Sequence, residues 1–187
     1  MNKAIFLDRD GTLIPSHEDR PISDVKDFYL FDGVVDGLKK MKDLGYLLIV
    51  VTNQSGVADG RWTLEQCQTI NHEICRCLNG SGILLDSIFM CTHHKEGNCE
   101  CRKPKPGMLY QARDKYNINL ERSYMIGNEI KDVLAGKNAG CKTILLKDRN
   151  KYIPSFEVTP DYYVDNLIEA SSYIRKLKWK SKERNRN

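Results

Sequence analysis

The chain has 187 residues, of which 41% are hydrophobic and 29% are charged, and its formal net charge is +4. This length predicts one domain with a sizeable core, and no apolar run reaches the roughly 18 residues that a membrane-spanning helix needs. The start, Met1-Asn2-Lys3-Ala4, lacks the long apolar stretch and the small-residue cleavage site of a signal peptide. We therefore expect no membrane partner and a cytoplasmic location.

The positive charge is concentrated at the C-terminal end. Residues 171–187 contain seven Lys or Arg and one Glu, and removing that +6 from the total of +4 leaves −2 for the body. A slightly acidic body argues against a nucleic-acid surface. We expect the basic end to be a solvated terminus without a nucleic-acid or membrane partner.

Short apolar runs that stop at polar clusters open the chain. Residues 4–7 predict a buried strand that ends at Asp8-Arg-Asp10-Gly-Thr, and residues 46–51 predict a second that ends at Thr52-Asn-Gln-Ser-Gly. Between them, apolar residues from 34 to 44 recur at helical spacing, and a glycine follows as a C-terminal cap. The first part of the chain is therefore a strand-helix-strand unit.

The same alternation continues to the end of the chain. The further elements expected, in order, are a helix at 63–78, a strand at 87–91, a polar loop at 92–106, a helix at 107–116, a strand at 123–126, a helix at 131–138, and strands at 143–146 and 162–164. Alternating strands and helices predict an α/β fold, with a Rossmann-like, mostly parallel sheet and helices on both faces. Such sheets bind ligands beyond the carboxyl ends of their strands, where the polar clusters fall.

The loop after the first strand carries two carboxylates. Asp8 and Asp10 frame a tight turn in which Gly11 lets the backbone approach a ligand closely. Two such carboxylates can hold a hard cation through oxygen, and one of them can attack a phosphorus atom. Asp-x-Asp is also common in capped turns, so by itself this motif favours a structural role.

Three more motifs follow in a fixed order. They are Thr52-Asn53 after an apolar strand, Lys103 ahead of Pro104, and Gly127-Asn128-x-x-x-Asp132. Together with Asp8-Arg-Asp10-Gly-Thr-Leu they resemble the four motifs of the haloacid dehalogenase (HAD) superfamily of phosphatases over nearly the whole chain. Val51-Thr-Asn-Gln-Ser-Gly-Val and Cys101-Arg-Lys-Pro-Lys-Pro-Gly-Met are similar, more narrowly, to the D-glycero-D-manno-heptose 1,7-bisphosphate 7-phosphatases. The histidinol-phosphate phosphatases are near relatives of that family.

This resemblance implies an Mg²⁺-dependent hydrolase that removes a phosphate from a small sugar bisphosphate in nucleotide-heptose synthesis. Asp8 would be the nucleophile that forms an aspartyl-phosphate, and Asp10 would protonate the leaving oxygen and then activate water. Thr52 and Lys103 would bind the phosphoryl oxygens. The residues implied to contact phosphate or sugar are Asn53, Gln54, Ser55, Arg102 and, in the loop after the first strand, Arg20. The sequence around Arg20 fits a solvated charged loop equally well.

One position departs from the family pattern. Asp8, Asp10 and residue 128 would hold Mg²⁺, and the family normally has Asp where this chain has Asn128. An amide oxygen can still bind the metal, but the loss of a negative charge predicts weaker Mg²⁺ binding. Glu129 could restore that charge nearby. The alternative is a weakly active homologue, or a non-catalytic module that binds a phosphosugar.

A second constellation lies in the polar loop. The cysteines number seven, and an odd number without an export signal favours thiols or metal ligands over disulfides. The pattern Cys91-x-His93, five residues, Cys99-x-Cys101 fits a tetrahedral structural Zn²⁺. His94 competes for the imidazole position, and the family spacing assigns it to His93. The zinc loop, 91–101, would hold Arg102 and Lys103 against the phosphate site.

The substrate and the domain limits are further expectations. The five residues between His93 and Cys99 resemble the histidinol-phosphate phosphatases, whereas Ser55 and the Pro-Gly-Met after Lys105 favour the heptose enzymes. We expect a heptose bisphosphate first and histidinol phosphate second. Residues 1–170 are expected to form the phosphatase domain of a monomer, and residues 171–187 a basic helix end and tail.

Overall fold

A parallel sheet organises the computed structural model, which describes residues 1–16, 28–147 and 158–184, with side chains as far as residue 179. The strands are β1 (Ala4–Leu7), β2 (Leu47–Asn53), β3 (Ser87–Cys91), β4 (Tyr124–Gly127), β5 (Lys142–Leu146) and β6 (Tyr162–Val164). They lie in the order β3-β2-β1-β4-β5-β6, and every neighbouring pair is parallel. The predicted parallel sheet is confirmed. The chain runs outward from β1 to β3 and then returns to β4, so the strand order reverses at β1.

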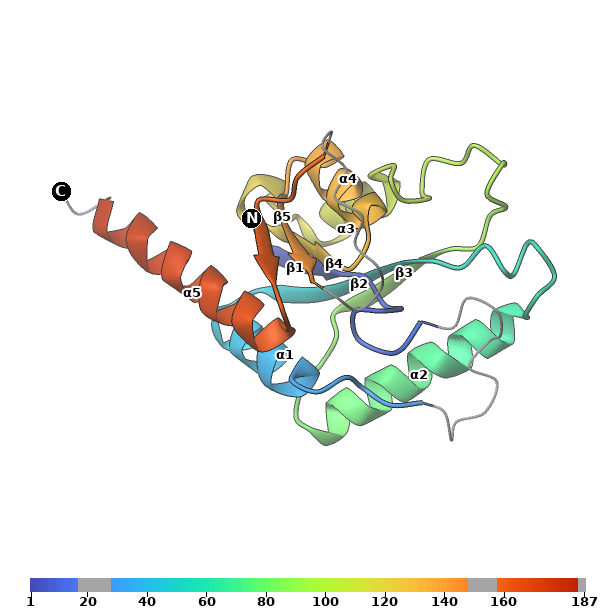
Figure 1. Ribbon diagram of the computed structural model, residues 1–187, viewed down its shortest axis with the longest axis horizontal. Helices are drawn as coiled ribbons and strands as arrows, with labels where there is room; N and C mark the ends of the chain where they lie inside the picture. Colours follow the sequence, from blue (N-terminus) through green and yellow to red (C-terminus); the bar gives the residue numbers. More distant parts are fainter. Residues whose placement is uncertain (17–27, 148–157, 185–187) are drawn as a thin grey trace.

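Helices cover both faces of this sheet, as predicted (Figure 1). The described helices are α1 (Val34–Asp43), α2 (Leu64–Gly80), α3 (Gly107–Tyr116), α4 (Ile130–Asn138) and α5 (Leu167–Arg184), with a 3₁₀ turn at Leu120–Arg122. Helices α1, α2 and α5 contribute to the core on one face, and α3 and α4 contribute to the core on the other. The expected capping box of α2 is present, because Thr63 and Gln66 each bond the other's backbone N–H through their side chains.

The two faces of β1 supply the two halves of the core. Ile5 and Leu7 pack with side chains of α1, α2 and α5, whereas Ala4 and Phe6 pack with side chains of α3 and α4. All four residues are fully buried. Side chains alternate between the faces of a strand, so a strand that is covered on both sides must be apolar throughout. This is why the sequence shows a continuous apolar run here.

Strand β2 extends further than the sequence predicts. It ends at Asn53, and its last two residues pair with the end of β3, Thr52 opposite Met90 and Asn53 opposite Cys91. Two motif residues that were expected in the loop are therefore held by the sheet. The first cysteine of the metal-ligand pattern lies directly beside them.

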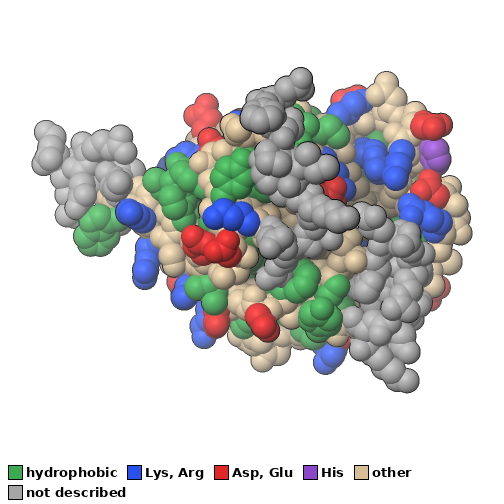
Figure 2. Space-filling view, in the orientation of Figure 1, with side chains coloured by type: hydrophobic (Ala, Val, Ile, Leu, Met, Phe, Trp, Pro, Cys, Tyr) green, Lys and Arg blue, Asp and Glu red, His purple; other side chains and the backbone are tan. Residues whose placement is uncertain are grey.

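The basic C-terminal segment is largely helical. Helix α5 continues to Arg184, and its far half extends beyond the rest of the molecule (Figure 1). Lys178 on this helix donates to the carbonyl oxygen of Leu44 at the end of α1. Figure 2 shows basic and acidic side chains close to one another on the visible face. None of the helices in the described ranges is long and apolar enough to span a membrane.

Candidate active site and metal centre

The carboxyl ends of β1, β2 and β4 meet at one edge of the sheet. Asp8 follows β1, Thr52 lies at the end of β2 and Asn128 follows β4. Strand β1 pairs with both other strands, so these residues are neighbours. All three are polar and yet buried, at 4%, 1% and 5% exposure. Buried polar groups at the point where the strand order reverses are typical of a ligand site.

A buried lysine joins two carboxylates at this edge. Lys103 Nζ lies 2.6 Å from Asp8 Oδ1 and 2.8 Å from Asp132 Oδ1, and it donates to the carbonyl oxygen of Val51 at 2.8 Å. Burial lowers the pKa of Lys103, but the two carboxylates outweigh burial and hold that pKa above its ordinary value. Two hydrogen bonds, to Asp8 and to Val51, and the ion pair with Asp132 fix the position of the ammonium.

Asp8 experiences opposing influences on its charge. Burial raises the pKa of Asp8 to about 7, Lys103 opposes the rise, and Asp132 and Asp10 add to it. A charge in a desolvated position is costly unless it is paired. Lys103 is therefore the group that favours the ionised form of Asp8, the form in which a carboxylate can act as a nucleophile.

The end of β2 fixes the loop that carries Lys103. Asn53 Nδ2 donates to the carbonyl oxygen of Lys103 at 2.9 Å, and Asn53 Oδ1 accepts from the backbone N–H of Lys103 at 3.0 Å. Both hydrogen-bonding sides of the amide are used in this way. Asn53 thus positions Lys103, and its predicted contact with substrate stays a prediction.

Asp10 is partly exposed and lies among hydrogen-bond donors. Gln54 Nε2 and Thr52 Oγ1 lie 2.7 and 3.3 Å from Asp10 Oδ2, and Gln54 also donates to Thr52 Oγ1 at 2.9 Å. Gln54 and Ser55 are buried, at 4% and 6% exposure. The Gln54 amide, expected to contact substrate, faces the Asp10 carboxylate and the Thr52 hydroxyl.

Asn128 lies against the first loop. One polar atom of its side-chain amide lies 3.2 Å from Asp8 Oδ2, 3.1 Å from the Asp10 carbonyl oxygen and 3.3 Å from Thr12 Oγ1. Because each of these three atoms can accept a hydrogen bond, the amide nitrogen is assigned to this position. A Cβ at Gly11, which has φ +82°, would collide with this amide, so the approach requires glycine. The Asp8 carboxylate, the Asp10 carbonyl and the Asn128 side chain converge. Once the amide presents its oxygen instead, this donor set fits a hard cation such as Mg²⁺.

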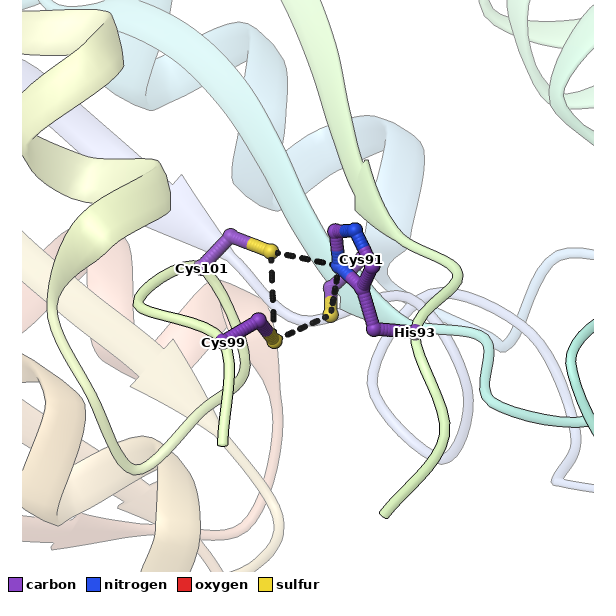
Figure 3. Close-up of side chains that lie close together, drawn as sticks. All are labelled: Cys91, His93, Cys99 and Cys101. Atoms are coloured by element: carbon purple, nitrogen blue, oxygen red, sulfur yellow. Dashed lines mark hydrogen bonds between the residues drawn. The ribbon is translucent and has the colours of Figure 1, made fainter. Parts of the chain in front are cut away.

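A Cys/His cluster lies at the end of β3 and in the loop that follows (Figure 3). The ligand atoms of Cys91, His93, Cys99 and Cys101 lie within 4.8 Å of one another, and four of their separations are 3.1–3.6 Å. Ligands about 2.3 Å from a tetrahedral zinc ion are roughly 3.8 Å apart, so the cluster fits Zn²⁺. His94 is not in the cluster, because its Nε2 faces Asp59 Oδ1 at 3.3 Å.

Three further residues singled out from the sequence are Arg102, Arg20 and Glu129. Arg102 Nη1 is buried without a hydrogen-bond partner in the described part of the chain. Arg20 lies outside the described residues. Glu129 is exposed and pairs with Lys131 at 2.7 Å, so its carboxylate is engaged at the surface.

Sequence reasoning missed Arg9 and Asn71. Arg9 is only 5% exposed, and its guanidinium contacts Asp10 and Asn71. An arginine in a polar loop is expected to face solvent. No local pattern links it to a helix residue 62 positions away.

Comparison of the sequence with known proteins identifies close relatives. The chain is 39% identical over 185 residues to the D-glycero-β-D-manno-heptose-1,7-bisphosphate 7-phosphatase of Pasteurella multocida, a match that covers 95% of this chain and 100% of the relative. It is 37% identical over 182 residues to the protein of the same name from Escherichia coli K12, and this match covers 92% of this chain and 94% of the relative. A HAD-hydrolase-like family model matches residues 100–170.

Comparison of structures agrees with the sequence matches. The D,D-heptose 1,7-bisphosphate phosphatase of B. bronchiseptica, solved with magnesium and phosphate, superposes with a TM-score of 0.81. The match covers 93% of this chain and 98% of that one, at 24% sequence identity. At this identity the likeness is one of fold.

Proposed function

The chain belongs to the heptose-1,7-bisphosphate 7-phosphatase family of HAD-like hydrolases, and from this membership we propose that it removes the 7-phosphate of D-glycero-D-manno-heptose 1,7-bisphosphate through an aspartyl-phosphate on Asp8. The observation that carries the proposal is the position of the Asp8 carboxylate. One oxygen faces the Lys103 ammonium at 2.6 Å, and the other faces the Asn128 amide. This places a desolvated nucleophile between a fixed cation and a candidate metal ligand.

The residues divide the reaction into two steps. Asp8 Oδ1 attacks the phosphorus, the bond from phosphorus to the sugar oxygen breaks, and Asp10 donates a proton to that oxygen. Asp10 then removes a proton from the water that attacks the phosphorus of the aspartyl-phosphate, which releases inorganic phosphate and restores Asp8. Thr52 and Lys103 orient the phosphoryl group and offset its charge, because phosphoryl transfer depends mainly on positioning and charge stabilisation.

Two metal ions have separate parts in this proposal. The Asp8 carboxylate, the Asp10 carbonyl and the Asn128 amide oxygen would hold Mg²⁺, which would supply neutralisation of charge where carboxylate and phosphate approach each other. Cys91, His93, Cys99 and Cys101 would hold Zn²⁺ in a structural role, since four protein ligands would leave no open position on a tetrahedral ion. The ion would then hold the loop in which Arg102 and Lys103 follow Cys101.

Phosphate release tests the substrate. We would supply Mg²⁺ and compare both anomers of the heptose bisphosphate with histidinol phosphate, with Asp8→Asn as the blank. The relatives are named for the β anomer, and we expect it to be preferred more than about tenfold in kcat/KM, or about 1.4 kcal/mol of transition-state discrimination.

Two other results would contradict the proposal. Turnover of histidinol phosphate alone would favour the second candidate, which the five residues between His93 and Cys99 support. An inactive wild type whose activity is restored by Asn128→Asp would favour a protein that binds phosphosugars.

Asn128→Asp is expected to bind Mg²⁺ at least about tenfold more tightly than the wild type, because a carboxylate adds a charged oxygen ligand. The same change removes the amide N–H groups of Asn128, which donate to Asp8 Oδ2 and to the Asp10 carbonyl oxygen. The metal-free variant should therefore be less stable by about 1–3 kcal/mol. Calorimetric titration with Mg²⁺ and urea unfolding without metal measure these two opposite effects.

Asn79→Asp provides the matched control, since Asn79 is exposed near the end of α2. It should change neither quantity by more than about 0.5 kcal/mol. Equal Mg²⁺ affinity in the wild type and in Asn128→Asp would refute Asn128 as a metal ligand.

A further inference from the structure

A buried arginine between the two motif aspartates has no part in the reaction described above. Arg9 is 5% exposed, and its Nε and Nη2 lie 3.1 and 3.2 Å from Asp10 Oδ2 and Oδ1. Its Nη1 donates to Asn71 Oδ1 at 2.9 Å, and Asn71 lies on α2. Burying a guanidinium is costly unless its donors are paired, and here all three nitrogen atoms have a partner.

The two oxygen atoms of Asp10 differ in their surroundings. Oδ2 lies near three donors, which are Arg9 Nε at 3.1 Å, Gln54 Nε2 at 2.7 Å and Thr52 Oγ1 at 3.3 Å. Oδ1 has the single donor Arg9 Nη2 among the described residues, at 3.2 Å. A carboxylate oxygen offers about two lone-pair sites, so Oδ2 is saturated and Oδ1 keeps a free one.

We propose that Arg9 and Gln54 are positioning residues that hold the Asp10 carboxylate so that Oδ1, and not Oδ2, exchanges the proton with the leaving oxygen and with water. Asn71 fixes the guanidinium from α2 and thereby couples the first loop to that helix. The inference deepens the proposed function and rests on it, because it identifies the oxygen through which Asp10 acts. It predicts a defect in proton donation rather than in substrate binding.

Aryl phosphates separate proton donation from a general loss of structure. The value of kcat/KM reports the steps as far as departure of the leaving group, and 4-nitrophenol departs with much less need for a proton than phenol does. In Arg9→Met we expect kcat/KM for phenyl phosphate to fall at least about tenfold more than kcat/KM for 4-nitrophenyl phosphate. KM should change little, and Arg9→Lys should recover part of the loss because it keeps a cation.

Further variants protect the test against misfolding. Gln54→Leu and Asn71→Leu should shift the leaving-group dependence in the same direction by a smaller factor. Arg76→Met is the matched control, because the Arg76 side chain lies on α2 and is 69% exposed, and it should leave both rates unchanged. Circular dichroism identifies any of Arg9→Met, Gln54→Leu and Asn71→Leu that does not fold. The variants that do fold then test the proposal.

Equal losses on both aryl phosphates in the folded variants would overturn the proposal and leave a structural role. The aryl series contains no sugar. A wild type that hydrolyses aryl phosphates but not the heptose bisphosphate would therefore refute the proposed substrate alone, and the positioning test would still decide. A wild type that hydrolyses none of the phosphate esters would overturn both.

Discussion

Lys103→Met is expected to lower the free energy of unfolding by about 3–5 kcal/mol, the usual cost of removing one partner from a buried ion pair. Lys103 is the cation between Asp8 and Asp132, and all three residues are at most 4% exposed. Methionine preserves the apolar stem, so the loss reflects two unpaired carboxylates and not a cavity. We also expect kcat/KM to fall by at least about 10²–10³-fold, as when a donor that stabilises the transition state is removed.

The stability loss should depend on pH with a defined sign. Burial already raises the pKa of Asp8 to about 7, and Lys103 is the group that opposes this rise. Without Lys103 the folded-state pKa of Asp8 moves further above its unfolded value. A carboxyl group with a raised folded-state pKa contributes stability that is lost as the pH rises through that value. The deficit relative to wild type should therefore be larger at pH 8 than at pH 5.

Urea unfolding at both pH values measures the effect, and Lys105→Met is its control. Lys105 lies two residues away and pairs with Glu100 at 2.9 Å, but its side chain is 36% exposed. Exposed ion pairs contribute about 0–1 kcal/mol, so this variant should remain near wild type. Similar losses of unfolding free energy in the two variants would show that the triad of Lys103, Asp8 and Asp132 stabilises the fold less than its burial indicates.

The fold and the place of the site could be predicted because both depend on local patterns. A strand that is covered on both faces must be apolar throughout, so the run at 4–7 indicates its own burial. The polar residues directly after such runs lie at one edge of a parallel sheet by geometry alone. The four cluster residues could be predicted for a related reason, because they fall within eleven consecutive positions, 91–101.

Contacts between distant segments could not be predicted from these patterns. The Asn53 amide bonds the backbone of Lys103, 50 positions away, and Arg9 bonds Asn71, 62 positions away. Both contacts depend on how the loop after β3 and the helix α2 pack on the sheet. The structure brings the motif residues together at the edge of the sheet that their order predicts, whereas the separate contacts of Asn53, Gln54 and Arg9 depend on side-chain geometry.

Loss of Cys99, one of the four proposed zinc ligands, is expected to have the second large effect. In Cys99→Ser, bound zinc should fall well below one ion per chain. The free energy of unfolding should fall by about 4 kcal/mol or more, because loss of a structural metal is among the few single changes that destabilise a protein this much. Most side chains between residues 92 and 100 are exposed, so the loop has little apolar burial of its own. A metal ion at the cluster would therefore be the main source of order in this loop.

The same variant should lower kcat/KM roughly 10–100-fold, the range seen when groups that support a metal site are changed. Arg102 and Lys103 directly follow Cys101 of the Cys/His cluster, so freedom in the loop would move both cations relative to Asp8. Metal analysis, thermal unfolding and phosphate release measure the three consequences. Cys77→Ser is the control, because Cys77 lies on α2 outside the cluster.

A zinc-free Cys99→Ser protein with the kcat/KM of the wild type would contradict this account. It would mean that the two hydrogen bonds from Asn53 to the backbone of Lys103 hold the ammonium in place without the metal. The variant Asn53→Ala in the zinc-bound protein separates the two supports. If the zinc loop is the principal one, Asn53→Ala should cost less activity than Cys99→Ser, and the reverse order would assign the positioning of Lys103 to β2.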